Sequence, residues 1–272
     1  MHPNIRAVLA ALEELGVSFS PILGFPDAVM VGSSAFIRAA TPFNNGSASL
    51  VCRDKAAVHA LLHGKIKMPK TISFKDPHEQ VSPGRFADIL NMSLDIFYPR
   101  IVKMNHGERG KNVFIARDDN ETVLALDSIF DPASKEYDYI ALIQEFIEPA
   151  REIRIVVVNG GCALAYYREK FESVSPDEFS LLSSFSRPIL DTIDLSWGAI
   201  DVIQSRNGTY YFIEVNTKPS FEGLIAARGI ALAKGFYIQA LSAFLHDKKA
   251  GISNSTGDTR RSCADASSHL SI

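Results

Sequence analysis

Apolar and polar positions alternate along this chain with two periods, one typical of helices and one typical of strands. The N-terminal segment has apolar residues at i, i+3 and i+4 spacing, which predicts an amphipathic helix and not a signal peptide. These residues are Ile5, Val8, Leu9, Leu12 and Leu15. Further helices are expected at residues 54–64, 83–93, 175–193 and 226–245. Pro188 should kink or end the third of these.

Strands are expected where β-branched and aromatic residues gather between turn residues. The predicted strands and extended segments are 28–34, 67–74, 98–104, 112–118 and 139–147, and two hairpins span 152–168 and 197–215. Hairpins late in a chain that also has helices predict an α+β or mixed α/β fold rather than a doubly wound sheet. Residues 248–272 are polar and rich in serine, which predicts a disordered tail.

The second hairpin carries hydrogen-bond acceptors on one face. If Asn207 and Gly208 form a two-residue turn, Asp201 lies directly opposite Glu214. Asn216 shares their face because side chains alternate along a strand. The other face is then apolar and belongs to the core. Its residues are Ile200, Val202, Tyr211, Ile213 and Val215.

Two carboxylates that face each other across a strand pair repel unless a cation lies between them. Two carboxylates and an amide offer oxygen ligands of the kind that Mg²⁺ or Mn²⁺ takes, with water and phosphate oxygens completing the octahedron. The hairpin therefore indicates a metal site. The alternative is a solvated polar face on which two acids meet by chance.

The first hairpin has Glu152 and Arg154 on one face and ends with Arg168. Its Asn-Gly-Gly turn leaves the register open, and only some registers bring Arg168 beside Arg154. Two cations there would clamp a phosphate or a substrate carboxylate. The alternative is an ordinary salt-bridge patch at the surface.

A glycine-containing loop follows the predicted strand that ends near Lys103. Gly107 and Gly110 would let backbone N–H groups approach phosphate oxygens, and Lys103 would add a point charge. The spacing is not that of a P-loop, and the loop joins a strand to a strand. A flexible hairpin without a phosphate is therefore the alternative.

The composition of the 272-residue chain excludes several classes of protein. A net charge of −3 and a pI near 6.2 provide no electrostatic footprint for nucleic acid or an anionic membrane. Cys52, Cys162 and Cys263 are far apart and odd in number, so neither a disulfide framework nor a zinc site is expected. No apolar run reaches the roughly 18 residues of a membrane span. These features predict a reduced, cytoplasmic protein.

Taken in order, these features resemble the ATP-grasp superfamily. The chain is most similar to its amino-acid and peptide ligases: the ribosomal-protein glutamate ligases, cyanophycin synthetase and the glutathione synthetase module of fused bacterial enzymes. The resemblance runs from about residue 30 to about residue 245. It rests on the segments CRDKAAVHALL, PRIVKMNHGERGKNV, LIQEFIEPAREIRIVVVNG, WGAIDVI and FIEVNTKPSFEGL.

The resemblance implies an ATP-grasp fold, in which two α+β subdomains clamp ATP. Residues 1–50 would form a short pre-grasp segment, and residues 51–147 the N-terminal part of the grasp with a small lid subdomain. Residues 148–247 would form the C-terminal subdomain with the metal site, and residues 248–272 the tail.

The resemblance also implies residues that bind ATP. Lys55 and Lys103 would contact its phosphates, and the loop with Gly107 and Gly110 would close over them. Glu152 would bind the ribose. The hinge strand, whose backbone would bind adenine, consists of Gln144, Glu145, Phe146 and Ile147.

The metal and the reacting groups would lie on the two hairpins. Asp201, Glu214 and Asn216 would hold Mg²⁺ or Mn²⁺, and Arg154 and Arg168 would stabilise an acyl phosphate and the tetrahedral intermediate. The implied reaction is an ATP-dependent ligation, in which a carboxylate attacks the γ-phosphate and an amine then displaces phosphate to give an amide. Two alternatives are an ATP-grasp kinase acting on a small molecule and a non-catalytic ATP-binding or partner-binding module.

Several positions depart from the family pattern. Met104 stands where proline usually follows the lysine, Asn112 stands at a frequent glycine, and Ser220 stands at another. The segment after Arg168 lacks the Arg/Asn/Gly-rich stretch of the glutamate ligases. The resemblance thus implies an amino-acid or peptide substrate without identifying it. One hypothesis is that a second subunit or a partner protein completes the substrate site.

Overall fold

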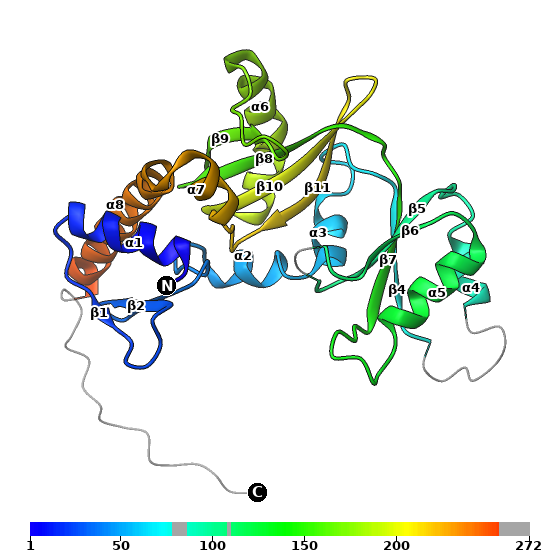
Figure 1. Cartoon of the computed structure of the whole chain (residues 1–272), viewed down its shortest axis with the longest axis horizontal. Helices are drawn as coiled ribbons and strands as arrows, with labels where there is room; N and C mark the ends of the chain where they lie inside the picture. The colour runs from blue at the N-terminus through cyan, green and yellow to red at the C-terminus, as the bar shows by residue number, and fades with distance from the viewer. Residues whose placement is uncertain (78–85, 108–109, 256–272) are drawn as a thin grey trace, which may run out of the picture.

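The computed structural model describes residues 1–77, 86–107 and 110–255, with side chains to residue 247. Figure 1 shows the arrangement of its helices and strands. In chain order these elements are α1 (Pro3–Glu14), β1 (Ser20–Pro21), β2 (Ala28–Val31), β3 (Ser34–Ile37), α2 (Gly46–Val51), α3 (Lys55–Leu62), β4 (Thr71–Lys75), α4 (Ala87–Met92), β5 (Arg100–Met104), β6 (Val113–Ala116), α5 (Asp119–Ile129), β7 (Ile140–Glu145), β8 (Pro149–Val158), β9 (Gly161–Tyr167), α6 (Pro176–Ile193), β10 (Trp197–Ser205), β11 (Tyr210–Asn216), α7 (Glu222–Arg228) and α8 (Ile230–Ser255).

Antiparallel sheets organise the described part of the chain. The central sheet has the strand order β11-β10-β8-β9, and the outer sheet has the order β4-β7-β5-β6. A small sheet, β1-β2-β3, lies near the N-terminus. Figure 1 shows α6 on one face of the central sheet, and α4 and α5 on the outer sheet. The mixed α+β class expected from the sequence is confirmed. No described helix is long and apolar enough to cross a membrane.

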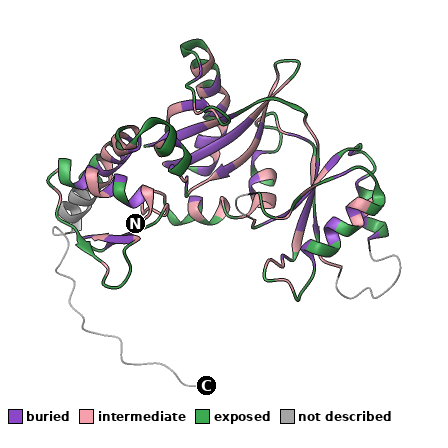
Figure 2. Cartoon of the chain, in the orientation of Figure 1, coloured by how far each residue is buried: buried purple, intermediate pink, exposed green. Residues whose placement is uncertain are grey.

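The central sheet separates two hydrophobic cores because its side chains alternate between its faces. One face packs against α6 and contributes Ile153, Ile155, Ile200 and Val202 to a buried cluster. Part of the opposite face is covered by α1, α7 and α8, while the rest is left for polar side chains. Figure 2 shows burial concentrated along these strands.

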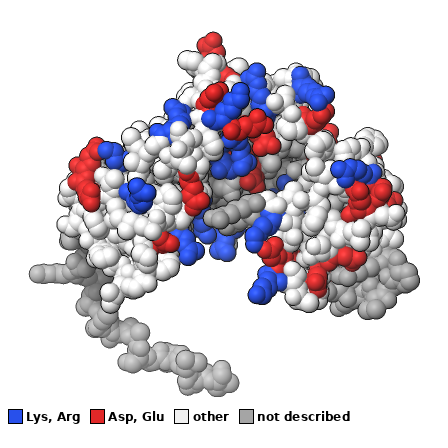
Figure 3. All heavy atoms as spheres, viewed as in Figure 1, with Lys and Arg blue, Asp and Glu red and all other residues white. Residues whose placement is uncertain are grey.

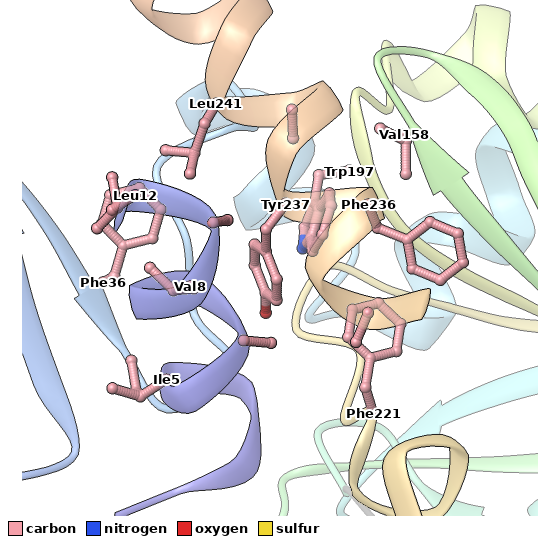
Figure 4. Close-up of a cluster of buried hydrophobic side chains, with 14 of the residues drawn as sticks. Ile5, Val8, Leu12, Phe36, Val158, Trp197, Phe221, Phe236, Tyr237 and Leu241 are labelled. Carbon is pink, nitrogen blue, oxygen red and sulfur yellow. The ribbon is translucent and has the colours of Figure 1, made fainter. Parts of the chain in front are cut away.

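Helices α1 and α8, from opposite ends of the chain, pack against each other in the core on that second face. Figure 4 shows Val8 and Leu12 of α1 in one cluster with Tyr237 and Leu241 of α8, with Leu12 close to Phe36. The predicted amphipathic N-terminal helix is therefore confirmed, with its apolar stripe buried. Trp197 at the start of β10 lies in the same cluster and is fully buried.

Two helix predictions need correction. Pro188 does not end helix α6, which continues to Ile193 with Leu182 before the proline and Ile189 after it both buried, and a kink at Pro188 stays a prediction. The closing helix is two helices, since Gly229 adopts φ +79° between α7 and α8. Helix α8 also runs through residues 248–255, which the sequence suggested were part of a disordered tail. Each residue added to an established helix gains one hydrogen bond, which favours this continuation.

Some predictions lie partly or wholly outside the described residues. Pro83, the predicted start of a helix, is one of them, and the observed helix α4 begins at Ala87. Residues 108–109 of the glycine loop and residues 256–272 of the tail are the others.

The turn of the second hairpin differs from the predicted two-residue turn. The Ser205 N–H donates to the Thr209 carbonyl at 2.9 Å, so three residues form the loop, and Gly208 alone of them has positive φ, +84°. A bulge between Asp201 and Val202 then restores the register expected at the acids. Phe212, and not Tyr211 or Ile213, therefore takes the buried place opposite Val202.

Candidate active site

Asp201 lies at the middle of a charged row across the central sheet. It faces Glu214 on one neighbouring strand and Arg154 on the other. Arg154 donates from Nε to Oδ1 and from Nη2 to Oδ2 of Asp201, both at 2.7 Å. Burial alone would raise the pKa of Asp201, which is 4% exposed, but the bonds and charge of Arg154 outweigh burial and lower it. Asp201 is thus an ionised carboxylate clamped by a guanidinium.

Glu214 has the opposite electrostatic environment. Burial and the neighbouring charge of Asp201 raise the pKa of Glu214, and the two side chains share a hydrogen bond. Asn216 Nδ2 donates to Glu214 Oε1 at 3.1 Å. A proton in this pair therefore resides on Glu214 rather than on Asp201, as expected for acids with different partners.

Arg168 approaches the same carboxylate from β9. The first hairpin turns at Asn159 and Gly160, with φ +52° and +73°, and a bulge between Val156 and Val157 sets the register that the sequence left open. Arg168 Nη1 lies 3.6 Å from Asp201 Oδ2 and 4.0 Å from a carboxylate oxygen of Glu152. The structure therefore brings both candidate arginines to Asp201.

The oxygen atoms at this site are of the kind that coordinate hard divalent cations. Asp201, Glu214 and Asn216 offer oxygen ligands from adjacent strands, and the shared hydrogen bond of the acids lies where a cation would replace a proton. Within the described ranges, no group of three His, Cys, Asp or Glu side chains has metal-binding geometry. Any cation here would therefore use the amide of Asn216 and ligands from outside the protein.

Lys103 is a buried cation of the outer sheet. Its side chain is 5% exposed, and its Nζ donates to Gln144 Oε1 at 2.9 Å. Burial lowers the pKa of Lys103 to about 8, with Glu214 opposing the shift and Lys55 adding to it. The negative charge of Glu214, on the central sheet, therefore acts on Lys103 of the outer sheet.

Gln144 connects Lys103 to helix α3. Its Nε2 donates to Thr71 Oγ1 at 2.8 Å and lies 3.2 Å from His59 Nε2. Burial, followed by the charge of Lys103, lowers the pKa of His59 to about 4, so its imidazole is neutral at neutral pH. The predicted hinge residue Gln144 thus holds the lysine in place through its side chain.

The rest of the predicted hinge continues from β7. Glu145 is the last residue of that strand, and its Oε2 accepts a hydrogen bond from the Lys70 N–H at 3.1 Å. Phe146 and Ile147 follow the strand and are half-buried. Their assignment to adenine stays a prediction.

Lys55 at the start of α3 reaches the glycine loop. Its Nζ donates to the carbonyls of Asn105 at 3.1 Å and Gly107 at 2.5 Å. A Cβ at Gly107 would lie 2.5 Å from Met104 Cγ and 3.0 Å from the Lys111 carbonyl oxygen, so any other residue here would force Met104 or the loop to shift. Asn112 adopts φ +48°, as expected for a residue that stands in place of glycine. Gly110 also has positive φ, +72°.

Two residues that support the site were not among those predicted from the sequence. Asn105 Oδ1 accepts from the Ala56 N–H at 2.8 Å and so joins the glycine loop to α3. Tyr166 pairs with Arg154 across β8 and β9 and is 2% exposed, and burial raises its pKa. The register of the first hairpin was needed to find Tyr166. Figure 3 shows that lysine and arginine side chains gather on both sides of the hollow at the centre of the molecule.

Comparison with known proteins identifies this arrangement. The family model for the RimK-like ATP-grasp domain matches residues 52–173. A probable alpha-L-glutamate ligase of Stenotrophomonas maltophilia (strain K279a) is 30% identical over 210 residues, covering 72% of this chain and 67% of the relative. A tetrahydromethanopterin:alpha-L-glutamate ligase of Methanococcus maripaludis is 25% identical over 193 residues, covering 65% and 61%. The chain spans about a third of the length of two similar Shewanella relatives, at 31% and 34%.

Solved structures show the same fold. D-alanine–D-alanine ligase from Bacillus anthracis superposes with a TM-score of 0.57 at 18% identity, over 78% of this chain and 72% of that chain. The same ligase complexed with ATP gives 0.57 at 20% identity, over 77% and 69%. The fold is therefore that of the ATP-grasp ligases, as the sequence predicted. Together with the relatives, this shows that the chain belongs to the RimK-like ATP-grasp family.

Proposed function

We propose that this protein is a Mg·ATP-dependent carboxylate–amine ligase that forms an amide or peptide bond on an amino acid or peptide. The observation that carries the proposal is the meeting of the acid pair of the central sheet with the buried lysine of the outer sheet. The charge of Glu214 raises the pKa of Lys103, and the charge of Lys55 lowers the pKa of Glu214. Acids for a metal and a lysine for phosphate are the groups that phosphoryl transfer needs.

In the proposed reaction, lysine and arginine side chains bind the negatively charged groups of ATP and of the intermediates. Lys103 and Lys55 contact the phosphates of ATP, and the glycine loop between them supplies backbone N–H groups. Arg168, which is 43% exposed and more loosely held than Arg154, binds the oxygens of the acyl phosphate and of the tetrahedral intermediate. Arg154 holds Asp201 in its orientation from the other side.

Asp201, Glu214 and Asn216 are the residues that would hold Mg²⁺, which neutralises phosphate charge when it is bound. ATP supplies the phosphoryl group that activates the carboxylate. The hinge from Gln144 to Ile147 would bind adenine, and Glu152 the ribose. The names of the relatives, which are ligases of glutamate or D-alanine, support an amino-acid substrate.

Calorimetric titration with a non-hydrolysable ATP analogue, with and without Mg²⁺, tests the first half of this proposal. We expect Mg²⁺-dependent binding with a Kd of about micromolar to sub-millimolar. ADP release should then require an added amine. Release of ADP without any amine would instead indicate a kinase, and the absence of nucleotide binding would indicate a non-catalytic module.

A further inference from the structure

A second pocket, apart from the residues assigned above, lies between α2 and the loop that follows β11. Its volume is about 260 Å³. Figure 1 shows α2 close to the end of β11, where this loop begins. The lining residues are Ala40, Thr41, Asn44, Gly46, Ser49, Leu50, Arg53, Thr217 and Lys218.

The pocket is positively charged. Arg53, which follows α2, and Lys218, in the loop after β11, contribute cations, and the lining contains no aspartate or glutamate. Neither cation forms an ion pair with another residue in the described part of the chain. The hydroxyl of Thr41 is buried without a hydrogen-bond partner among the described residues. A ligand with an anionic group and hydrogen-bonding oxygens would satisfy all three side chains.

The walls of the pocket are held in place by the fold. Asn44 Nδ2 donates to the Trp197 carbonyl at 2.7 Å, and its Oδ1 accepts from the N–H groups of Ser196 and Trp197 at 3.1 and 2.9 Å. These three bonds fix the segment before α2 to the start of β10. The pocket is therefore preformed, and binding there loses little conformational entropy.

Chain connectivity places the pocket beside the proposed site. Thr217 and Lys218 directly follow Asn216, a proposed metal ligand, and Arg53 precedes Lys55 by two residues. The pocket is smaller than the roughly 300–1,000 Å³ typical of sites for drug-sized ligands, so it suits a group of amino-acid size rather than a nucleotide.

We propose that this pocket binds the carboxylate of the amine substrate, with Arg53 and Lys218 as its counter-charges and Thr41 as a third contact. The inference rests on the proposed ligase function. The amine substrate is then an amino acid, or the carboxyl end of a peptide, rather than a neutral amine.

Binding is tested first, without turnover. Backbone amide resonances are followed by NMR while L-glutamate or L-alanine is added to the protein with Mg²⁺ and a non-hydrolysable ATP analogue. L-glutamine α-amide and L-alaninamide, which keep the amine but lack a carboxylate, serve as the control probes. We expect the acids, and not the amides, to shift Gly46 and Thr217. Equal shifts by acids and amides, or no shift at these residues, would overturn the inference.

Variants locate the effect. Arg53→Gln and Lys218→Gln should each raise the KM for the amine substrate roughly tenfold to hundredfold, and should leave the affinity for the ATP analogue within about twofold. Lys75→Gln removes an exposed cation from β4 and should change neither quantity. Unchanged KM values in both pocket variants would also overturn the inference. Failure of the ligase proposal would give a different result: the wild-type protein would release no ADP in response to an added amine. The NMR titration would still show whether the pocket binds a carboxylate.

Discussion

In the central sheet the buried carboxylate of Asp201 meets two arginines, whereas in the outer sheet the buried ammonium of Lys103 hydrogen-bonds to the neutral amide of Gln144. The two groups are almost equally buried, at 4% and 5% exposure. One charge is compensated by ionic partners within the protein, and its pKa moves so as to keep the charge. The other is compensated incompletely, and its pKa moves so as to lose it.

This difference indicates that the two sheets have different roles. The central sheet holds its charges in a fixed arrangement before any ligand arrives, which suits the reacting groups of an enzyme. In the outer sheet, the binding of an anion would stabilise the protonated form of Lys103. Changes in the central sheet should therefore affect the chemical step most, and changes in the outer sheet should affect nucleotide affinity.

The largest expected effect follows from replacing Glu214 by glutamine. The amide keeps the shape and retains a partner for Asn216, but removes a charge that a divalent cation would need. We expect amine-dependent ADP release to fall about a thousandfold or more, with an unchanged melting temperature. Wild-type turnover in Glu214→Gln would refute the metal assignment.

Replacing Lys103 by glutamine tests the outer sheet. We expect the Kd of the ATP analogue at about pH 7 to rise roughly tenfold to hundredfold, because the variant lacks the positive charge that Lys103 places beside the phosphates. Lys75→Gln, on the same sheet but exposed, should leave this Kd unchanged. If both variants bind equally well, Lys103 does not contact phosphate.

The pH dependence of nucleotide binding sharpens the same test. Lys103 has a pKa of about 8, below its ordinary value of 10.5. Between these two values the unfolded chain carries the proton and the folded chain does not, so raising the pH stabilises the fold through this group. Phosphate binds the protonated form of Lys103 more tightly than the neutral form. The affinity of the wild-type protein for the ATP analogue should therefore be about tenfold lower at about pH 9 than at about pH 7. Lys103→Gln should lack this fall, and a flat wild-type profile would contradict the role.

A smaller effect is expected where α7 covers the central sheet. A Cβ at Gly223 would lie 2.5 Å from Cζ of Phe171, whose ring stacks on Tyr166 at 5.7 Å. Gly223→Ala should therefore reduce the free energy of unfolding by about 1–3 kcal/mol. Gly235→Ala in α8 meets no atom within 4 Å and should stabilise by about 0.5–1 kcal/mol. Chemical denaturation of both variants provides the comparison, and equal stability of the two would rule out the close contact.

The smallest effect distinguishes the observed turn from the predicted one. Gly208→Val places a β-branched residue at φ +84° and should cost about 1–2 kcal/mol in unfolding free energy. Asn207→Val should cost less, because Asn207 has no positive φ and loses only the hydrogen bonds of Oδ1 to Ser205 and Thr209. Equal losses in both variants, measured by thermal melting, would favour the two-residue turn.

The sequence was sufficient for features that depend on local spacing. Alternation placed Asp201, Glu214 and Asn216 on one face, and the predicted helix at 175–193 agrees closely with α6. The three-residue turn was not readable, because its register depends on a bulge several residues away. The prediction of Asp201 opposite Glu214 was therefore correct although its turn was wrong.

Contacts between strands that are not neighbours in sequence could not be predicted in the same way. The bond of Arg154 to Asp201 requires β8 to lie beside β10, and α6 separates these strands in the chain. Helix α5, by contrast, was not predicted although its sequence carries helix signals. Asp118 caps it, and Thr122, Ala125, Leu126 and Ile129 form its buried stripe at helical spacing.

The packing of α1 against α8 has a consequence during synthesis. During synthesis α1 precedes α8 by more than two hundred residues, so the apolar stripe of α1 is made long before the residues of α8 that share its cluster. At roughly 5–20 residues per second this interval lasts about ten seconds or more. Throughout that time α1 can pack only against early residues of its cluster, such as Val29 and Phe36, and the apolar surface that α8 will cover stays open to other apolar surfaces.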